Sequence, residues 1–564
     1  MSMPWAAPRF TARREPVAVL GDHLTATGVG GGRRASRRQR GSEVAALAVC
    51  TLLATWLVLH DLGARSLWLD EAFTFGAASQ HGGRLLPAVL EDAGNAVAYY
   101  LGMHFWTGVF GDTETALRAP SALAAIGMVP VCYYLVRRLF GAWAAVLSAA
   151  CVAVSLPMVW WGQDARAYVP AVFLTCCSTL AFVVAVQARH RWAWAVYFAL
   201  SVLAAYTLLL SVLVVLAQAI SLLGRRRGDI QWRALVLPAT LSATALVPLA
   251  WVGLDHGTRP IQWIPPPGPL LSRNNLYFVD FLASSKNVNV PFHHWQVDSL
   301  TCAVLLCWTA ALALAVRSTR QHPRGPEAWG YLLLLSWLLL PPVVTWVFSK
   351  EVQPVFSDRY ILFSVVGGSM LTGVALSRVP WRTLGAAAAI TILALRAAVI
   401  LPSYGVPLEN WRIGVTNLVA HSKPGDCIAF FVADAYMPFD YYVVNLHLRG
   451  VVPQLVLPRT TWGARSAYAE QPQSFTPAQF EAVTRSCARL WLVTSHAGSE
   501  APGPGVLAYR ALVYRTEHYL VSEITSAYNK VSALDFLGAK VALYMRNVSR
   551  VPSSGFPAET RGGA

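Results

Sequence analysis

Charged residues are scarce in this chain. Asp, Glu, Lys and Arg make up 13% of its 564 residues, whereas 55% are hydrophobic and the mean hydropathy is +0.45. A soluble domain usually has about 25% charged residues, so the composition excludes an ordinary soluble protein. It indicates a helical membrane protein with one domain outside the membrane.

Acidic residues are fewer than basic ones: 29 Asp and Glu stand against 45 Lys and Arg, which gives a net charge of +16. The basic residues lie in short clusters between apolar runs. In a membrane protein such clusters set the orientation of the helices and contact anionic lipid headgroups. No nucleic-acid recognition motif accompanies the charge, so we expect membrane lipids as partners and no nucleic acid.

Two further features are missing. Residues 1–43 are polar and rich in Arg, and no small-residue cleavage site follows the first apolar run. The sequence therefore predicts a disordered, basic cytoplasmic tail and no cleavable signal peptide. No Cys/His spacing resembles a zinc site, so no metal ligand is predicted, and the sequence does not decide whether a divalent metal takes part.

The chain contains about eleven apolar runs, each close to the roughly 20 residues that a helix needs to cross a bilayer. They lie at residues 44–60, 119–136, 142–160, 168–187, 192–206, 207–223, 233–252, 299–316, 328–348, 360–377 and 383–402. The fifth and sixth runs are continuous and by themselves fit either a tight hairpin near Tyr206 or one tilted helix. Only the hairpin places all basic clusters on the cytoplasmic side. We therefore expect about eleven spans in the plasma membrane, with the N-terminus inside and the C-terminus outside.

Residues 44–402 form the predicted membrane domain, and residues 403–564 differ from them in composition. Strand-like and helical runs alternate in this second part, which predicts a small extracytoplasmic α/β domain. These runs lie at 427–432, 477–487, 490–494 and 541–545. Cys427 and Cys487 each stand at the start of a predicted strand in an oxidising compartment, which favours a disulfide between them.

The first candidate site follows the first span, where Asp70 and Glu71 lie in the sequence WLDEAFT at 68–74. Partial burial beside this aromatic segment raises the pKa of a carboxyl group and makes it a better base. An exposed acidic pair on a short interfacial helix explains the same residues without chemistry. The spacing alone does not decide between the two.

Two further clusters lie on the same predicted side of the membrane. The sequence WWGQDARAY at 160–168 contains Arg166, whose guanidinium can donate two hydrogen bonds to a phosphate. Lys350 and Arg359 lie near a later helix mouth and form, with Arg166, a candidate phosphate cradle. Basic residues on the outer side run against the positive-inside bias, and an anionic lipid headgroup supplies a reason for them. An aromatic interfacial anchor and weak surface ion pairs are the alternatives.

Together and in this order, these residues resemble the GT-C superfamily of integral-membrane glycosyltransferases. The most similar branch is the protein-mannosyltransferase type, glycosyltransferase family 39, with its actinobacterial mannosyltransferase relatives. The resemblance covers roughly residues 44–402 and implies a GT-C-like helical membrane fold. It also implies that Asp70, which matches the first residue of the family's acidic pair, is the base that deprotonates the acceptor.

The resemblance also assigns residues that bind the substrates. Tyr99 and Tyr100 match a tyrosine pair of the family, although residues 95–98 replace the family's usual His-Pro-Pro. The family's RLPSAL-like, Q-E-A-R-x-Y and late R-Y elements correspond to RAPSAL at 118–123, QDARAY at 163–168 and DRY at 358–360. Together with Lys350, the predicted substrate-binding residues are Glu71, Tyr99, Tyr100, Arg118, Gln163, Arg166, Tyr168, Arg359 and Tyr360.

The implied reaction transfers a sugar from a polyprenyl-phosphate donor to an extracytoplasmic acceptor hydroxyl, with inversion at C1. The family branch and the high Ala and Arg content suggest mannose as the sugar and a cell-envelope acceptor such as a lipoglycan. Arabinofuranosyl transfer and protein O-mannosylation stay open. A transporter or flippase for lipid-linked sugars is an alternative of another class, and it predicts ionisable residues within the spans and a repeated half. A structural assembly subunit without chemistry is the third reading.

Overall fold

The structure, a computed structural model, describes most of the chain, and residues Leu47–Ala564 form one compact unit. The described residues are 29–90, 95–188, 190–226, 228, 230–256, 264–269, 273–284, 293–448, 450–458, 477–495 and 508–547. Residues 1–28 of the predicted tail lie outside them. Residues 29–43 are helical, which differs from the predicted disorder, because α1 (Val29–Leu59) begins before its apolar part. Arg and Ala favour a helix, so an apolar helix extends readily through them.

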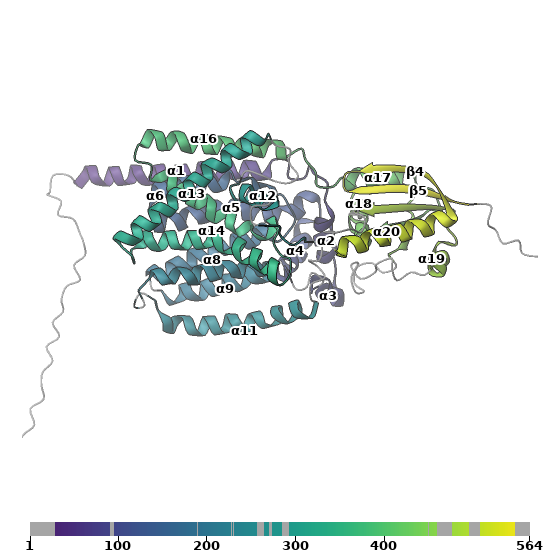
Figure 1. Cartoon of the computed structure of the whole chain (residues 1–564), viewed down its shortest axis with the longest axis horizontal. Helices are drawn as coiled ribbons and strands as arrows, with labels where there is room; N and C mark the ends of the chain where they lie inside the picture. The colour runs from purple at the N-terminus through teal and green to yellow at the C-terminus, as the bar shows by residue number, and fades with distance from the viewer. Residues whose placement is uncertain are drawn as a thin grey trace, which may run out of the picture. The chain divides into compact units, whose positions relative to one another are not determined.

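Long apolar helices make up most of the structure before residue 400 (Figure 1). In the described ranges, seven helices are long and apolar enough to cross a membrane, so the chain is a polytopic helical membrane protein. They are α1, α5 (Glu114–Phe140), α8 (Tyr168–Ala188), α11 (Trp232–His256), α13 (His294–Gln321), α14 (Pro326–Glu351) and α16 (Arg382–Ile400). The helices α6 (Ala142–Ala153) and α7 (Leu156–Gly162), bent by 53°, make an eighth span if they count as one.

The predicted count of about eleven spans is not confirmed, although a helix lies over every predicted run. Three of these helices are short: α9 (Arg191–Thr207) has 17 residues, α10 (Val212–Ser221) has 10 and α15 (Leu362–Ser377) has 16. A helix needs about 20 residues to cross the hydrocarbon core. An apolar run in the sequence therefore overstates the length of the straight helix that it forms.

The helices α9 and α10 form the hairpin that the charge pattern favours. The backbone leaves the helix at Leu208. Across the two arms, the Tyr197 hydroxyl donates a hydrogen bond to Gln218 Oε1 at 2.8 Å. Tyr197 and Gln218 lie at similar distances along the chain from the break, so the two arms run antiparallel.

The basic clusters and the predicted site lie near opposite ends of α14. At its start, Glu327 pairs with Arg378, and the Arg225 guanidinium lies 4.8 Å from the centroid of the Trp329 ring. At its other end, the chain continues into the short helix η6 (Asp358–Tyr360), which holds Arg359. The bundle thus has one end with basic clusters and, opposite, the end that carries the predicted site.

Residues after α16 fold into an α/β domain, as predicted, around a five-stranded sheet of order β2-β1-β3-β5-β4. The strands are β1 (Cys427–Phe431), β2 (Gln454–Leu457), β3 (Arg489–Ser495), β4 (Tyr528–Phe536) and β5 (Ala539–Arg546). β1 pairs in parallel with β2 and β3, whereas β5 pairs antiparallel with β3 and β4.

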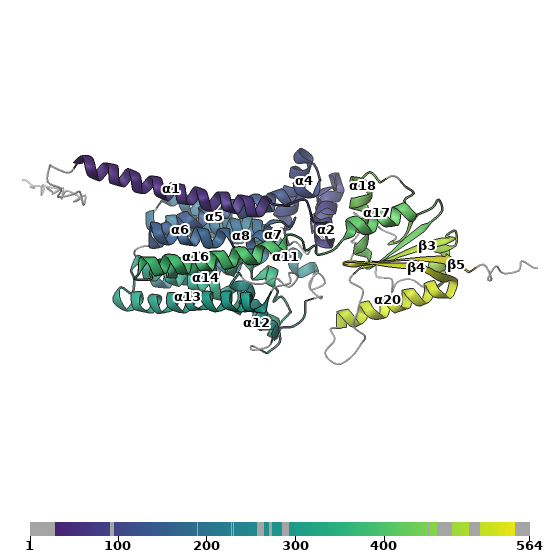
Figure 2. The ribbon, with the colours of Figure 1, turned by 90° about the horizontal axis from the view of Figure 1, so that it is seen from above.

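Helices cover both faces of this sheet (Figure 2). Ile428 and Phe430 of β1 pack against α17 (Trp411–His421) and α18 (Tyr436–Asn445). Ala429 and Phe431 face the other side, which α19 (Pro477–Thr484) and α20 (Ala508–Ala527) cover. The alternation follows from the two-residue repeat of a strand buried on both faces.

The segment between α1 and α5 folds against the α17 and α18 face. It forms α2 (Leu69–Ala78), α3 (Leu85–Leu90) and α4 (Val97–Phe110). Its buried residues belong to the same hydrophobic cluster as those of α17 and α18, and the Phe75 and Tyr441 rings lie with centroids 5.0 Å apart. The helix α2, which carries the predicted catalytic aspartate, is therefore packed against the C-terminal domain.

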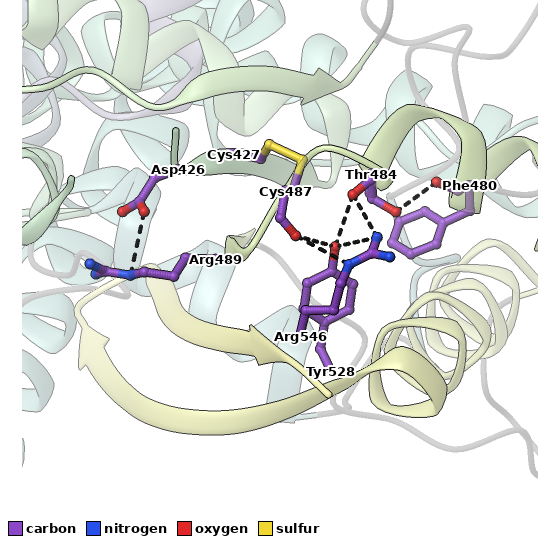
Figure 3. The surroundings of a disulfide bond; sticks show 8 residues. All are labelled: Asp426, Cys427, Phe480, Thr484, Cys487, Arg489, Tyr528 and Arg546. Atoms are coloured by element: carbon purple, nitrogen blue, oxygen red, sulfur yellow. Dashed lines mark hydrogen bonds and ion pairs between the residues drawn. A yellow bond between two sulfur atoms is a disulfide. The ribbon is translucent and has the colours of Figure 1, made fainter. Parts of the chain in front are cut away.

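A disulfide joins Cys427 of β1 to Cys487, just before β3, the pair proposed from the sequence (Figure 3). Their Cα atoms lie 5.7 Å apart. Beside the bond, Arg546 Nη2 donates to the Thr484 carbonyl at 2.7 Å, and the Tyr528 hydroxyl donates to the Cys487 carbonyl at 2.9 Å. The disulfide and these hydrogen bonds hold the residues just before β3 in place.

Candidate active site

The Asp70 carboxylate lies in the first turn of α2, at the end of the bundle opposite the basic clusters. Its side chain is 20% exposed, and Nη1 of Arg359 donates a hydrogen bond to its Oδ2 at 2.8 Å. The two residues are 289 positions apart in the sequence. The fold therefore brings together the predicted base and a predicted phosphate ligand.

Arg166 lies in the turn between α7 and α8 and approaches the same carboxylate. Its Nε lies 4.0 Å from Asp70 Oδ2. Its Nη1 donates to the Tyr100 hydroxyl of α4 at 2.8 Å and to the Asp70 carbonyl at 3.4 Å. Tyr100 thus holds the second guanidinium beside Asp70.

Aromatic rings surround Arg359. Its guanidinium carbon lies 5.5 Å from the centroid of Trp68 and 5.8 Å from those of Trp161 and Tyr168. Its Nη1 also donates to the Tyr168 hydroxyl at 3.2 Å. The Tyr360 ring meets that of Tyr168 edge-on, with centroids 6.5 Å apart. Cation–π contacts hold a guanidinium without neutralising its charge, so Arg359 keeps its capacity to bind an anion.

Two guanidinium groups and one carboxylate therefore share a partly exposed site. The Arg166 and Arg359 side chains are 12% and 17% exposed. A guanidinium matches the oxygen geometry of a phosphate, and a positioned carboxylate can accept a proton from a reacting hydroxyl. The arrangement can bind a phosphate group and remove a proton at neighbouring points.

Glu71 and Arg118 form a buried ion pair beneath this site. Arg118 Nε and Nη2 donate to Glu71 Oε1 and Oε2 at 2.7 and 2.6 Å, and the two side chains are 2% exposed or less. Glu71 Oε1 also accepts the Ala165 amide at 2.9 Å. Arg118 Nη1 donates to the carbonyls of Leu62 and Arg65, each at 3.0 Å. Burial raises the pKa of the Glu71 carboxyl, but the charge and hydrogen bonds of Arg118 outweigh burial, so the pKa lies below its usual value.

Glu71 and Arg118, both predicted to bind substrate, are thus bonded to protein groups in this structure. The pair joins the segment before α2, the start of α5 and the turn before α8. Its role is to position the elements that carry Asp70 and Arg166.

Gln163, another predicted substrate-binding residue, likewise bonds protein groups in this structure. The residue is 3% exposed. Its Nε2 donates to the carbonyls of Val58 and His60 at 3.0 and 2.6 Å. Its Oε1 accepts a hydrogen bond from Arg65 Nη2 at 3.3 Å. The side chain thereby joins the end of α1 to the turn that presents Arg166.

Asp164, which the sequence motif contains but to which no role was assigned, supports the aromatic wall. Its Oδ1 accepts a hydrogen bond from the Trp68 indole at 2.8 Å, whereas its Oδ2 is buried without a partner in the described part of the chain. Burial, and then the charge of Glu71, raises the pKa of Asp164 well above its usual value. Both effects favour the protonated, neutral form of this side chain.

Tyr99 and Lys350 do not contact the Asp70 cluster through any bond among the described residues. Tyr99 is buried with its ring against that of Tyr100, the centroids 5.8 Å apart. Lys350 is exposed near the end of α14, and its ammonium lies 5.8 Å from the Trp346 ring centroid. Of the three cations predicted to cradle the phosphate, only Arg166 and Arg359 therefore lie at Asp70 in this structure.

In the described ranges, no three His, Cys, Asp or Glu side chains are grouped closely enough to hold a metal ion. The described residues thus offer no ligand set for the divalent metal that the sequence left undecided.

Some residues that support the site have no signal in the sequence. Glu409 accepts a hydrogen bond from the Leu69 amide at 3.0 Å. The Tyr442 hydroxyl accepts one from the Leu67 amide at 2.7 Å. Both partners come from beyond the bundle and are more than 300 positions away, so no local motif could have identified them.

Residues 96–251 match the model of the family described as dolichyl-phosphate-mannose-protein mannosyltransferase. The match runs from the start of α4 into α11 and covers less than half of the chain. A comparison with curated protein sequences finds no match.

Solved structures share the fold. ArnT from Cupriavidus metallidurans in the apo state is 15% identical with a TM-score of 0.57, over 90% of this chain and 98% of that chain. The same protein bound to undecaprenyl phosphate is 15% identical with a TM-score of 0.53, over 89% and 98%. The Archaeoglobus fulgidus oligosaccharyltransferase tethered with an acceptor peptide is 11% identical with a TM-score of 0.51, over 91% and 75%. The chain has the GT-C fold that its motifs predicted.

Proposed function

We propose that this GT-C-fold protein is a membrane glycosyltransferase that moves a sugar from a polyprenyl-phosphate donor to an acceptor hydroxyl. The observation that carries the proposal is the 2.8 Å contact between Asp70 and Arg359, with Arg166 within 4.0 Å of the same carboxylate oxygen. This contact combines a proton acceptor with two phosphate ligands. A lipid-phosphate sugar needs both during transfer.

The comparisons support a lipid-phosphate donor. One similar structure, that of ArnT, was determined with undecaprenyl phosphate bound. The family whose model matches residues 96–251 is described by a dolichyl-phosphate-mannose donor. We therefore propose a polyprenyl-phosphate carrier and mannose as the sugar.

In the proposed mechanism, Arg166 and Arg359 bind the donor phosphate and stabilise the charge that builds up as its bond to the sugar breaks. Asp70 accepts the proton of the acceptor hydroxyl. The acceptor oxygen forms its bond to C1 from the face opposite the departing phosphate, so the configuration at C1 inverts. The products are the glycosylated acceptor and the polyprenyl phosphate.

We propose a cell-envelope acceptor such as a lipoglycan, and a plasma-membrane location with the site and the C-terminal domain on the extracytoplasmic side. The basic clusters at the opposite end of the bundle support this orientation. Arabinofuranosyl transfer and protein O-mannosylation are the alternatives that the same base and phosphate ligands would serve. The sugar of the donor separates arabinofuranosyl transfer from the proposal, and the acceptor separates protein O-mannosylation from it.

A transfer assay tests the proposal. Membranes with the wild-type protein should move radiolabelled mannose from polyprenyl-phosphate-mannose to envelope acceptors, and Asp70→Asn should lower the rate by about a hundredfold or more. Arg359→Lys should keep the charge but lose the two-pronged phosphate geometry, and it should lower the rate less than Arg359→Ala.

Two outcomes contradict the proposal. Unchanged envelope glycans in cells that lack the protein, together with movement of lipid-linked sugar across vesicle membranes, would indicate a flippase. An Asp70→Asn protein as active as the wild type would remove Asp70 as the base.

A further inference from the structure

A residue of the C-terminal domain accepts a hydrogen bond from the first amide of α2, the helix that carries Asp70. Leu69 is the first residue of α2, and its amide donates to Glu409 Oε2 at 3.0 Å. The first amides of a helix have no partner within the helix, so an acceptor placed there fixes where the helix starts. A carboxylate is also favoured there because it meets the positive end of the helix dipole.

Glu409 is held rigidly by its own domain. Its residue is 4% exposed, and the Trp411 indole donates to the same Oε2 atom. Gly538, in the turn between β4 and β5, lies against its side chain: a Cβ added to this glycine would come within 2.5 Å of Glu409 Cγ. The neighbouring Asn410 amide donates to the Leu537 carbonyl of that turn at 2.8 Å. The turn of the sheet thereby sets the position of the carboxylate.

A second group of contacts fixes the segment just before α2. The Tyr442 hydroxyl accepts the Leu67 amide at 2.7 Å and bonds Glu114 Oε1 at 2.7 Å. Arg412 Nη2 donates to Glu114 Oε1 at 2.6 Å and to the Gly63 carbonyl at 3.1 Å. The backbone around residues 63–69 is thus bonded on one side by α17 and α18.

We infer that Glu409 is a positioning residue for catalysis: through the Leu69 amide it sets the start of α2 and thereby the place of the Asp70 carboxylate relative to Arg359. The inference rests on the proposed function in so far as Asp70 is the base. It gives the C-terminal domain a part in the chemistry that is separate from any binding of the acceptor.

The geometry explains why a small shift here matters. Asp70 follows Leu69 directly, so a change in the first turn of α2 moves its carboxylate with it. Asp70 must meet an acceptor hydroxyl beside a phosphate held by Arg359 and Arg166, and a misplacement of about 1 Å can lower a rate about a hundredfold. The donor phosphate itself binds the two guanidinium groups, neither of which contacts Glu409 among the described residues.

The test compares three substitutions of Glu409 in the full-length protein, with polyprenyl-phosphate-mannose as the donor. Glu409→Ala should lower kcat about tenfold to a hundredfold and change the KM for the donor less than about threefold. Glu409→Gln keeps an acceptor oxygen for the Leu69 amide and should retain most of the activity. Glu409→Asp keeps the charge but withdraws the oxygen by one methylene, so its kcat should fall between those of the other two.

Hydrogen exchange of the peptide 67–75 gives a readout without activity. Glu409→Ala should speed exchange at the start of α2, and Glu409→Gln should not. Glu481 is an exposed carboxylate on α19, and Glu481→Ala is the matched control. It should change neither the rate of sugar transfer nor the hydrogen exchange of peptide 67–75. If Glu409→Ala does not fold, Glu409→Asp is compared with Glu409→Gln and the wild type instead.

The outcomes separate the two proposals. A wild-type protein without transfer activity contradicts the proposed function, and the exchange experiment still decides the role of Glu409. Unchanged exchange in peptide 67–75 for both Glu409→Ala and Glu409→Asp overturns the inference. So does a Glu409→Gln protein as impaired as Glu409→Ala, because the contact to Leu69 would then not be what matters.

Discussion

Arg359 Nη1 donates to Asp70 Oδ2 at 2.8 Å, so the proposed phosphate ligand and the proposed base neutralise each other. In this state the aspartate occupies the guanidinium that the donor phosphate needs. We propose that the donor phosphate competes with Asp70 for this Nη1 donor, and that the carboxylate so released accepts the proton of the acceptor. In this proposal, donor binding and activation of the base are linked through one hydrogen bond.

Asp70→Asn should therefore bind polyprenyl phosphate more tightly than the wild type, although it should transfer sugar at least about a hundredfold more slowly. Removing the competing charge from this partly exposed site should strengthen binding about tenfold. Titration of the purified proteins with polyprenyl phosphate measures the change. Glu351→Gln removes an exposed negative charge near the same end of the bundle and should leave the affinity unchanged. Equal or weaker binding by Asp70→Asn would show that the two anions do not compete.

Breaking the buried pair of Glu71 and Arg118 should destabilise the protein. Arg118→Leu leaves the Glu71 carboxylate buried without its partner, and the expected loss is about 3–5 kcal/mol in free energy of unfolding. Glu71→Gln should have a similar effect on Arg118. The double variant Glu71→Gln/Arg118→Leu should lose less than the sum of the two, because no unpaired charge remains. Thermal unfolding of the detergent-solubilised proteins measures these losses of stability. A double variant whose loss equals the sum of the two single losses would contradict the pairing of Glu71 with Arg118.

Asp164 should make stability fall as the pH rises. Its folded-state pKa is raised by burial and then by the charge of Glu71. The folded protein therefore holds this proton at pH values where the unfolded chain has released it, and stability declines from the unfolded pKa towards the folded one. Asp164→Asn lacks this titration, so its melting temperature should gain on that of the wild type as the pH rises above the unfolded-state pKa of an aspartate, about 3.9. Parallel curves for the two proteins would mean that Asp164 is not the titrating group.

Loss of the disulfide should weaken the C-terminal domain. Cys427 and Cys487 are 60 positions apart, and closing a loop of this length stabilises a domain by about 4 kcal/mol in the chain-entropy model. Cys427→Ala/Cys487→Ala should melt earlier than the wild type and should not respond to a reducing agent. Cys302→Ala, which removes an exposed free cysteine, should melt like the wild type. A double variant as stable as this control would show that the bond contributes little.

Local patterns in the sequence predicted the fold well where the pattern is strong. The strands predicted at 490–494 and 541–545 are present as β3 and β5. The strand β2 was missed because it has only four residues, and β4 because most of its residues are exposed on both faces. The expected count of about eleven spans is not confirmed, because apolar composition does not report where a helix breaks.

The candidate site was predicted in part for a similar reason. Motif and charge identified Asp70, Arg166 and Arg359, which the structure brings together. The same motif assigned Glu71 to the substrate, whereas burial makes it a partner of Arg118. Residue type does not reveal burial, so a sequence cannot separate a side chain that contacts a ligand from one that holds the contacting side chain.

The bonds from Glu409 to Leu69 and from Tyr442 to Leu67 span 340 and 375 positions. A ribosome completes the segment around Leu69 long before it reaches Glu409. The segment around Leu69 therefore receives these two partners only after synthesis has reached Tyr442. We expect a product truncated before Glu409 to lack both bonds.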